Sequence, residues 1–494
     1  MKIANKIVLL FLATCMLIVP LASCSDKGDS NTQTQAPAGN NNGSNNNNPS
    51  GDEDALPPHQ TYGGTPVVIF SWNPDQPDFV LDEDDAYNTK RTQALWERNL
   101  AIEEHLGITI SYVTMDGHYD QMNNFIKTLE ASISVGDAAF DLVQQYNLTA
   151  AVATMRGLYL DIAQNPEVNL TDAPYWSAEI KEELSYNGKV YFMTGDIAPT
   201  VLGLTACMAY NKDMIRDLNL ENPYQLHKNN EWTWDKFFEL CKNVYIDQGD
   251  QGVDSYDRYG WGADAVFYDV SYHSIGLRLV EKDADGALKI SEDLYSDKAY
   301  TFVTHFQEFL DSEDVGFIYE DLGDNKAYDN SAAFNSKNLL FLTTYMSCDY
   351  DVKFGVMPPP KYDSQQDRYY TLLNMRHSQF SIPYDTPSFE VSGAALEYLA
   401  MESYRSVTPA IFEDTFKTEL ADAPEDAEMF DVIRASITWD FGRIYGETLG
   451  GLYSGWRKIF QYGASDPASQ LKSNAEYSAT KLEAVCTTLA SLKR

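Results

Sequence analysis

The residues that could carry out covalent catalysis do not form a recognised catalytic pattern. The chain has 73 acidic residues, so the carboxylate pairs that glycoside hydrolysis needs would arise by chance. Its 7 histidines lie far apart, and neither G-x-S-x-G nor H-E-x-x-H occurs. Ser469 and Lys472 match S-x-x-K, but the companion motifs are missing. The sequence therefore predicts no catalytic residues.

Side chains suited to non-covalent binding stand where two apolar runs end. Trp72 closes the run 65–72, and Gln145, Tyr146 and Asn147 close the run 139–146. Aromatic rings pack on flat C–H faces, and amides bond to hydroxyl groups in a largely preformed cleft. Packing in the core would equally explain Trp72, and a turn at the end of a strand would explain the other three residues. Ligand binding and these structural roles therefore both stay open.

Around these residues, apolar runs and helical spacing alternate. Strands are predicted over 65–72, 108–113 and 139–146, and helices over about 88–105 and 121–135. Such alternation favours parallel pairing with right-handed crossovers, hence an α/β fold. The carboxyl ends of the strands then share one edge, where open α/β sheets bind ligands.

Further along the chain, the sequence predicts more strands and helices. A hairpin turns at Gly188, and an apolar strand follows it; another strand covers 205–210, and Thr233 caps a helix. A strand ends in the prolines 358–360, and a helix covers about 390–404. The folded part has about 430 residues, too many for one ordinary core, so two lobes are expected.

The N-terminus has the pattern of an export signal. Lys2 and Lys6 precede an apolar stretch over 7–19, and small residues lead to Cys24. The order L-A-S-C resembles the lipobox of bacterial lipoproteins, which implies a signal peptide over 1–23 and a lipid, such as palmitate, on Cys24. An uncleaved anchor or a plain cleavable signal is the alternative. Residues 24–64 are rich in Asn, Gly and Ser and predict a disordered tether, or a tail without a mechanical role.

The formal net charge of −37 excludes some partners. Such a field repels nucleic acid and anionic lipid, and it disfavours an anionic solute unless a local arginine overrides it. Two bridges among Cys207, Cys241, Cys348 and Cys486 would allow three pairings, which the sequence cannot resolve. Cys207 and Cys241 lie in apolar segments, which favours buried thiols.

Six motifs in a fixed order then point to a family: YNGKVYF with TGD, AYNKDM, WTWDKF, DRYGWG, FGVMPPPKYD and EYLAMESYRSVTPAIFED. The chain resembles the extracellular solute-binding proteins of bacterial ABC importers, family 1, the carbohydrate-binding type. The resemblance implies a two-lobed, type II periplasmic-binding-protein fold that closes about a hinge. It implies a monomer without enzymatic activity that delivers a saccharide to permease subunits, lipid-anchored outside the cell membrane.

By analogy, the first lobe holds 65–195 and about 358–403, and the second holds 196–357 and about 404–494. The chain would cross near 194–199, near 358–360 and after 404. The predicted ligand-binding residues are Trp72, Gln145, Tyr146, Asn147, Asp196, Tyr210, Asn211, Trp261, Tyr268, Arg376, Trp439 and Trp456, with His377 beside Arg376. For each, packing or capping is the alternative role.

Many relatives carry a calcium loop after the WTWDKF helix. Here Asp247, Asp250, Asp254 and Asp257 remain, but Gln251 stands where the loop glycine belongs, and an early ligand position is missing. A solvated acidic loop is favoured over calcium, and no cofactor is expected. The competing functions are a secreted glycan-binding protein or glycoside hydrolase without a transport role, and a binder of peptides or metal ions.

Overall fold

The computed structural model describes residues 56–74, 78–171, 173–247, 257–263, 266–312, 316–318, 338–344, 353–462 and 466–492. The chain divides into two compact units, Met1–Glu53 and Asp54–Arg494, and all described residues belong to the second. The predicted signal peptide, Cys24 and the tether as far as residue 55 lie outside them. Within the described parts of the chain, every helix is too short or too polar to span a bilayer.

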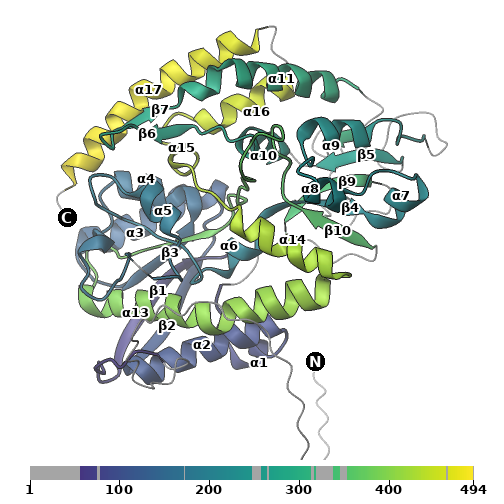
Figure 1. Ribbon diagram of the computed structural model, residues 1–494. Coiled ribbons are helices and arrows are strands. Elements are labelled where there is room, and N and C mark those ends of the chain that lie inside the picture. The colour runs from purple at the N-terminus through teal and green to yellow at the C-terminus, as the bar shows by residue number, and fades with distance from the viewer. Residues whose placement is uncertain are drawn as a thin grey trace, which may run out of the picture. The chain divides into compact units, whose positions relative to one another are not determined.

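The first sheet forms as the alternating pattern predicts. Its order is β11-β3-β1-β2, with β1 parallel to both β2 and β3, and β11 antiparallel to β3. Helices α2 and α13 lie on one side of this sheet in Figure 1, and α3 and α4 on the other. The elements are β1 (Thr65–Trp72), α2 (Lys90–Leu106), β2 (Ile108–Met115), α3 (Met122–Val135), β3 (Leu142–Tyr146), α4 (Asn147–Met155), β11 (Ser378–Ser381) and α13 (Phe389–Glu402).

Local chemistry sets the ends of these helices. Helix α2 begins at a reciprocal cap, in which the Thr89 and Thr92 hydroxyls each accept from the other residue's backbone N–H at 3.0 Å. It ends at Gly107, whose φ of 60° is the left-handed conformation that glycine adopts without strain. Across the sheet, the Phe70 ring of β1 stacks on Phe125 of α3 with centroids 4.2 Å apart. The apolar strand and the helical stripe therefore form one core.

The second sheet has the order β10-β4-β9-β5-β8. Its strands are β4 (Ala206–Asn211), β5 (Tyr259–Ala263), β8 (Gly316–Ile318), β9 (Asn338–Thr344) and β10 (Phe354–Met357), with helices α7 (Lys212–Asp217), α8 (Pro223–Lys228), α9 (Trp234–Cys241) and α14 (Pro424–Ala435). The Thr233 hydroxyl accepts from the Lys236 N–H at 3.4 Å, which confirms the predicted cap of α9. Trp234 follows it and packs edge-on against Phe267, Phe302 and Phe306.

The remaining elements cover and join the two sheets. They are α1 (Glu83–Ala86), η1 (Tyr119–Gln121), η2 (Ile162–Gln164), α5 (Ala178–Leu184), α6 (Pro199–Gly203), α10 (Val266–Ser274), β6 (Val280–Lys282), β7 (Leu288–Ile290), η3 (Glu292–Tyr295), α11 (Asp297–Leu310), the π-helical η7 (Ser403–Val407) and η8 (Ala410–Leu420), α15 (Phe441–Ile444), α16 (Leu452–Tyr462) and α17 (Pro467–Ser491). Helix α16 packs on α10 and α17, as Figure 1 shows at the top.

Three segments link the first lobe, built on the first sheet, to the second lobe, built on the second. They lie side by side at 204–206, 371–374 and 436–438. The Ala206 N–H donates to Leu372 O at 3.0 Å, and the Thr371 N–H donates to Ser436 O at 2.8 Å. The first two lie further along the chain than the crossings predicted near 194–199 and 358–360, and the third lies after 404, where the last crossing was placed. The lobe bounds drawn from the resemblance stay a prediction.

The hairpin at Gly188 forms, but the strand expected after it does not. Tyr186 and Lys189 pair around the turn. Beyond the turn, Met193 bridges to Phe380, whereas Gly195 bridges to Trp176. Because the segment changes partner within a few residues, no continuous ladder develops.

Candidate functional site

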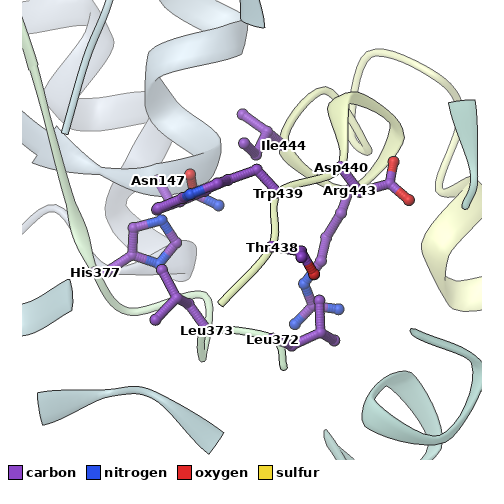
Figure 2. Close-up of a pocket in the computed structure, with 9 residues that line it drawn as sticks. All are labelled: Asn147, Leu372, Leu373, His377, Thr438, Trp439, Asp440, Arg443 and Ile444. Atoms are coloured by element: carbon purple, nitrogen blue, oxygen red, sulfur yellow. The ribbon is translucent and has the colours of Figure 1, made fainter. Parts of the chain in front are cut away.

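A pocket lies where the linking segments meet the carboxyl end of strand β3. Its empty space is about 250 Å³ when the open solvent at its mouth is counted. Figure 2 shows that its lining comes from parts of the chain far apart in sequence. The lining residues are Asn147, Leu372, Leu373, His377, Thr438, Trp439, Asp440, Arg443 and Ile444.

The first lobe contributes Asn147 and His377. Asn147 opens helix α4 directly after β3, and its Oδ1 accepts from Gln379 Nε2 at 3.0 Å. His377 Nδ1 lies 2.7 Å from Asn374 O, which can only accept, so Nδ1 carries the proton. Burial lowers the pKa of His377 to about 4, so the ring is neutral at pH 7 and its Nε2 is an acceptor. This wall offers neutral hydrogen-bonding groups.

The opposite wall comes from the segment after the third link. Trp439 stands edge-on to His377, with centroids 5.5 Å apart and an interplanar angle of 70°. The Thr438 hydroxyl is hydrogen-bonded to His273 Nε2. Asp440 caps α15, because its carboxylate accepts from the N–H groups of Gly442 and Leu279, each at 2.7 Å. An indole ring and a hydroxyl therefore face the first lobe's polar groups.

The charged group of the pocket is Arg443 on α15. Its side chain is buried, and its Nη1 donates to Asp269 Oδ2 at 2.8 Å. Arg457 donates to the same oxygen at 2.7 Å, so two guanidinium groups share one carboxylate. Burial works to lower the pKa of Arg443, but Asp269 outweighs it and raises that pKa above the usual value. Arg443 is therefore a permanent cation in the pocket wall.

Next to the pocket, the ends of β1 and β3 hold an aromatic group. Trp72 Nε1 donates to Ser378 Oγ at 2.9 Å, and the indole stands edge-on to Tyr146 at 5.4 Å and to His118 at 5.0 Å. Burial raises the pKa of Tyr146 to about 12, so its hydroxyl keeps its proton. The exposed Arg376 lies within electrostatic reach of this hydroxyl.

Sequence comparison identifies the family. Residues 86–340, just over half of the chain, match the family of bacterial extracellular solute-binding proteins. The chain belongs to this family. No protein with a curated description matches the sequence.

Solved structures of solute-binding proteins share the fold. A cyclo/maltodextrin-binding protein complexed with maltotetraose has a TM-score of 0.55 at 14% identity, covering 85% of this chain and 98% of its own. The galacto-N-biose-/lacto-N-biose I-binding protein of Bifidobacterium longum scores 0.54 at 13% identity, covering 86% and 98%. Maltose-bound MalE3 of T. maritima scores 0.54 at 12% identity, covering 84% and 99%. The predicted two-lobed, type II fold is thereby confirmed.

In this solute-binding protein, five of the predicted ligand residues gather in or beside the pocket. They are Trp72, Tyr146, Asn147, Arg376 and Trp439. Thr438, Asp440 and Arg443 also line it, although no sequence pattern marks them as ligand-binding residues. Their only sequence signal is proximity to Trp439.

The other predicted residues pack away from the pocket. Two lie in the first lobe: Gln145 Nε2 donates to Ser381 Oγ at 2.8 Å, and Asp196 accepts from the Thr408 hydroxyl. The rest lie in the second lobe, where Tyr210 packs against Gly355, Asn211 caps α7, Trp261 stacks on Phe267, Tyr268 stacks on Phe460, and Trp456 Nε1 donates to Ser271 Oγ. Ligand contact by these seven residues stays a prediction, as does ligand contact by the five residues in or beside the pocket.

The acidic loop, which stands where relatives carry a calcium loop, is only partly described. Asp250 and Asp254 lie outside the described residues. Asp257 is buried, and the Tyr245 hydroxyl donates to its Oδ2 at 3.0 Å. Among the described parts of the chain, no group of three or more His, Cys, Asp or Glu side chains is placed to hold a metal ion.

The cysteines that the structure describes include two free thiols. Cys241 is buried and its Sγ lies 3.4 Å from Gly260 O, and Cys486 is half-buried on α17. Cys207 is buried in β4, whereas Cys348 lies outside the described residues.

Proposed function

We propose that this protein captures a saccharide between its two lobes and delivers it to the permease subunits of an ABC importer. The observation that carries the proposal is the pocket at the lobe junction. An indole ring there faces an amide and an imidazole that come from the other wall. Rings suit the C–H faces of a sugar, and the polar groups suit its hydroxyls.

The placement of the pocket explains how binding can drive closure. Asn147 and His377 belong to the first lobe, whereas Thr438 is the last residue of a linking segment and Trp439 follows it directly. A ligand shifts an open–closed equilibrium only by its difference in affinity for the two states. A sugar that contacts both walls binds the closed state more tightly than the open state, because only the closed state supplies both sets of contacts. A permease can then recognise the closed form.

The proposal includes no catalytic step. It places the protein outside the cell membrane as a monomer, held by a lipid on Cys24 and a tether over residues 24–64. The L-A-S-C sequence and the Asn- and Gly-rich composition after it support this part. The experiment is expression of Cys24→Ala in a bacterial host. We expect the wild type to partition into Triton X-114 and the variant into the aqueous phase; equal partitioning would refute the anchor.

Titration calorimetry of the purified protein against mono- and oligosaccharides tests the binding proposal. We expect at least one saccharide to bind, and Asn147→Ala to weaken it by about tenfold through loss of a hydrogen bond. Asn124→Ala, on an exposed part of α3, is the matched control and should bind as the wild type does. Binding of peptides alone, or turnover of the glycan, would overturn the proposal.

A further inference from the structure

One polar atom in the pocket wall lacks a hydrogen-bond partner. Arg443 is only 4% exposed, yet its Nη2 is bonded to no other group among the described residues. The Tyr272 hydroxyl lies close enough to the guanidinium to help raise the pKa of Arg443. Within the described chain, neither this hydroxyl nor Arg443 Nη2 has a partner at good hydrogen-bond distance and angle. A buried donor left unpaired costs free energy that a ligand atom can recover.

The surroundings of Arg443 carry an excess of positive charge. Arg443 and Arg457 share the single carboxylate of Asp269. The Asp440 carboxylate also belongs to the lining, but backbone N–H groups satisfy it. In Figure 2 it points away from the guanidinium, which lies beside Leu372 and Thr438.

The neighbouring histidines add no charge. Burial lowers the pKa of His273 and of His377, so both rings are neutral at pH 7. Arg278 Nη1 lies 3.4 Å from the His273 ring and is a third guanidinium near the pocket, but it faces the Glu183 and Asp440 carboxylates, so it is left out of the balance between Arg443, Arg457 and Asp269. Two guanidiniums against one carboxylate therefore leave about one unit of charge for a bound solute to balance.

We propose that the solute is an acidic saccharide whose carboxylate binds the free edge of the Arg443 guanidinium. A carboxylate is a monoanion, which matches the single excess charge, and its planar oxygens suit the guanidinium fork. This inference rests on the proposed function, since it names the class of sugar that the same pocket takes. It reverses the expectation of a neutral solute that the chain's acidity favours.

Matched ligand pairs test this on the wild-type protein. Calorimetry would compare glucuronate with glucose, galacturonate with galactose, and digalacturonate with its methyl ester. We expect a uronate to bind at least about tenfold more tightly than its neutral counterpart, from the strength of a charge-assisted hydrogen bond. Neutral sugars that bind as tightly as their acidic counterparts would overturn this inference and leave the proposed function intact. Failure of every saccharide to bind would overturn both.

Variants of Arg443 and Arg457 test which guanidinium contacts the uronate carboxylate. Arg443→Gln should weaken uronate binding by about 10- to 100-fold, a larger loss than for the matched neutral sugar. Asp269 keeps Arg457 as a partner in this variant, which protects the fold. Arg457→Gln is the matched comparison, because it removes the same excess charge beside Asp269 but does not line the pocket, so uronate affinity should fall clearly less than in Arg443→Gln. Full uronate affinity in Arg443→Gln would overturn the assignment, and the ligand pairs decide the chemistry even if that variant fails to fold.

Discussion

Glu183→Gln should stabilise the protein at alkaline pH. Glu183 lies half-buried on helix α5, and burial, aided by the Asp440 carboxylate, raises its pKa to about 7. Glu179 acts in the same direction, whereas Arg278 and Lys282 act against it. Ionised Glu183 is therefore less favourable in the folded protein than in the unfolded chain.

The sign and the size of the stability change follow from the linkage between proton binding and folding. The folded state binds the Glu183 proton more tightly than the unfolded chain does, so stability present below pH 4.5 is lost as the pH rises through about 7. One pKa unit corresponds to about 1.4 kcal/mol, which sets an upper limit of about 3.4 kcal/mol. Solvent screening of this half-buried group reduces the expected gain of the variant to about 1–2 kcal/mol at pH 8.

Urea unfolding followed by tryptophan fluorescence at pH 4.5 and pH 8 measures this gain. The variant should be clearly more stable than the wild type at pH 8 and nearly equal to it at pH 4.5. Glu182→Gln is the control, because this neighbour on the same helix is exposed and its replacement should have little effect at either pH. An equal difference at both pH values, or the same gain from the control, would refute the linkage reasoning.

Three further predictions concern buried groups. Between pH 7 and pH 4, the free energy of unfolding should fall by about 1–3 kcal/mol more in the wild type than in His377→Gln. The lowered pKa of about 4 means that folding disfavours the charged ring, and urea unfolding at the two pH values measures this difference. Gly393→Ala should destabilise by about 1–3 kcal/mol in urea unfolding, because its Cβ would come within 2.0 Å of Asn165 Oδ1. Cys241 should react with a thiol reagent only in denaturant, as peptide mass mapping would show, since the thiol is buried and burial raises its pKa.

The first lobe could be predicted from the sequence because its pattern is local. Buried parallel strands appear as short apolar runs such as Thr65–Trp72, and a glycine with positive φ ends the helix at Gly107. The segment after Gly188 has a similar apolar run without forming a strand. Its partners, Phe380 and Trp176, come from elsewhere in the chain, so tertiary context decides its structure and the run itself does not.

The candidate site could be predicted only in part. Trp72 and Asn147 were predicted because the ends of parallel strands meet at one edge, and of these two Asn147 lines the pocket whereas Trp72 is fully buried. The same aromatic criterion also selected Trp261 and Trp456, which pack inside the second lobe. Aromatic rings pack equally well in a hydrophobic core and against a bound ligand, so residue type alone cannot distinguish the two roles.

Arg443 shows why composition misleads about the solute. Its partner Asp269 lies 174 positions away in the sequence, so no local pattern marks the pair. The net charge of −37 acts through solvent, where screening limits its reach to about 8 Å at physiological salt. The buried guanidinium acts at hydrogen-bond distance, where screening is weak and an unmade bond is costly. Total charge therefore governs how any anion approaches the surface, whereas the balance between Arg443, Arg457 and Asp269 sets the local charge of the pocket, on which the proposed uronate binding depends.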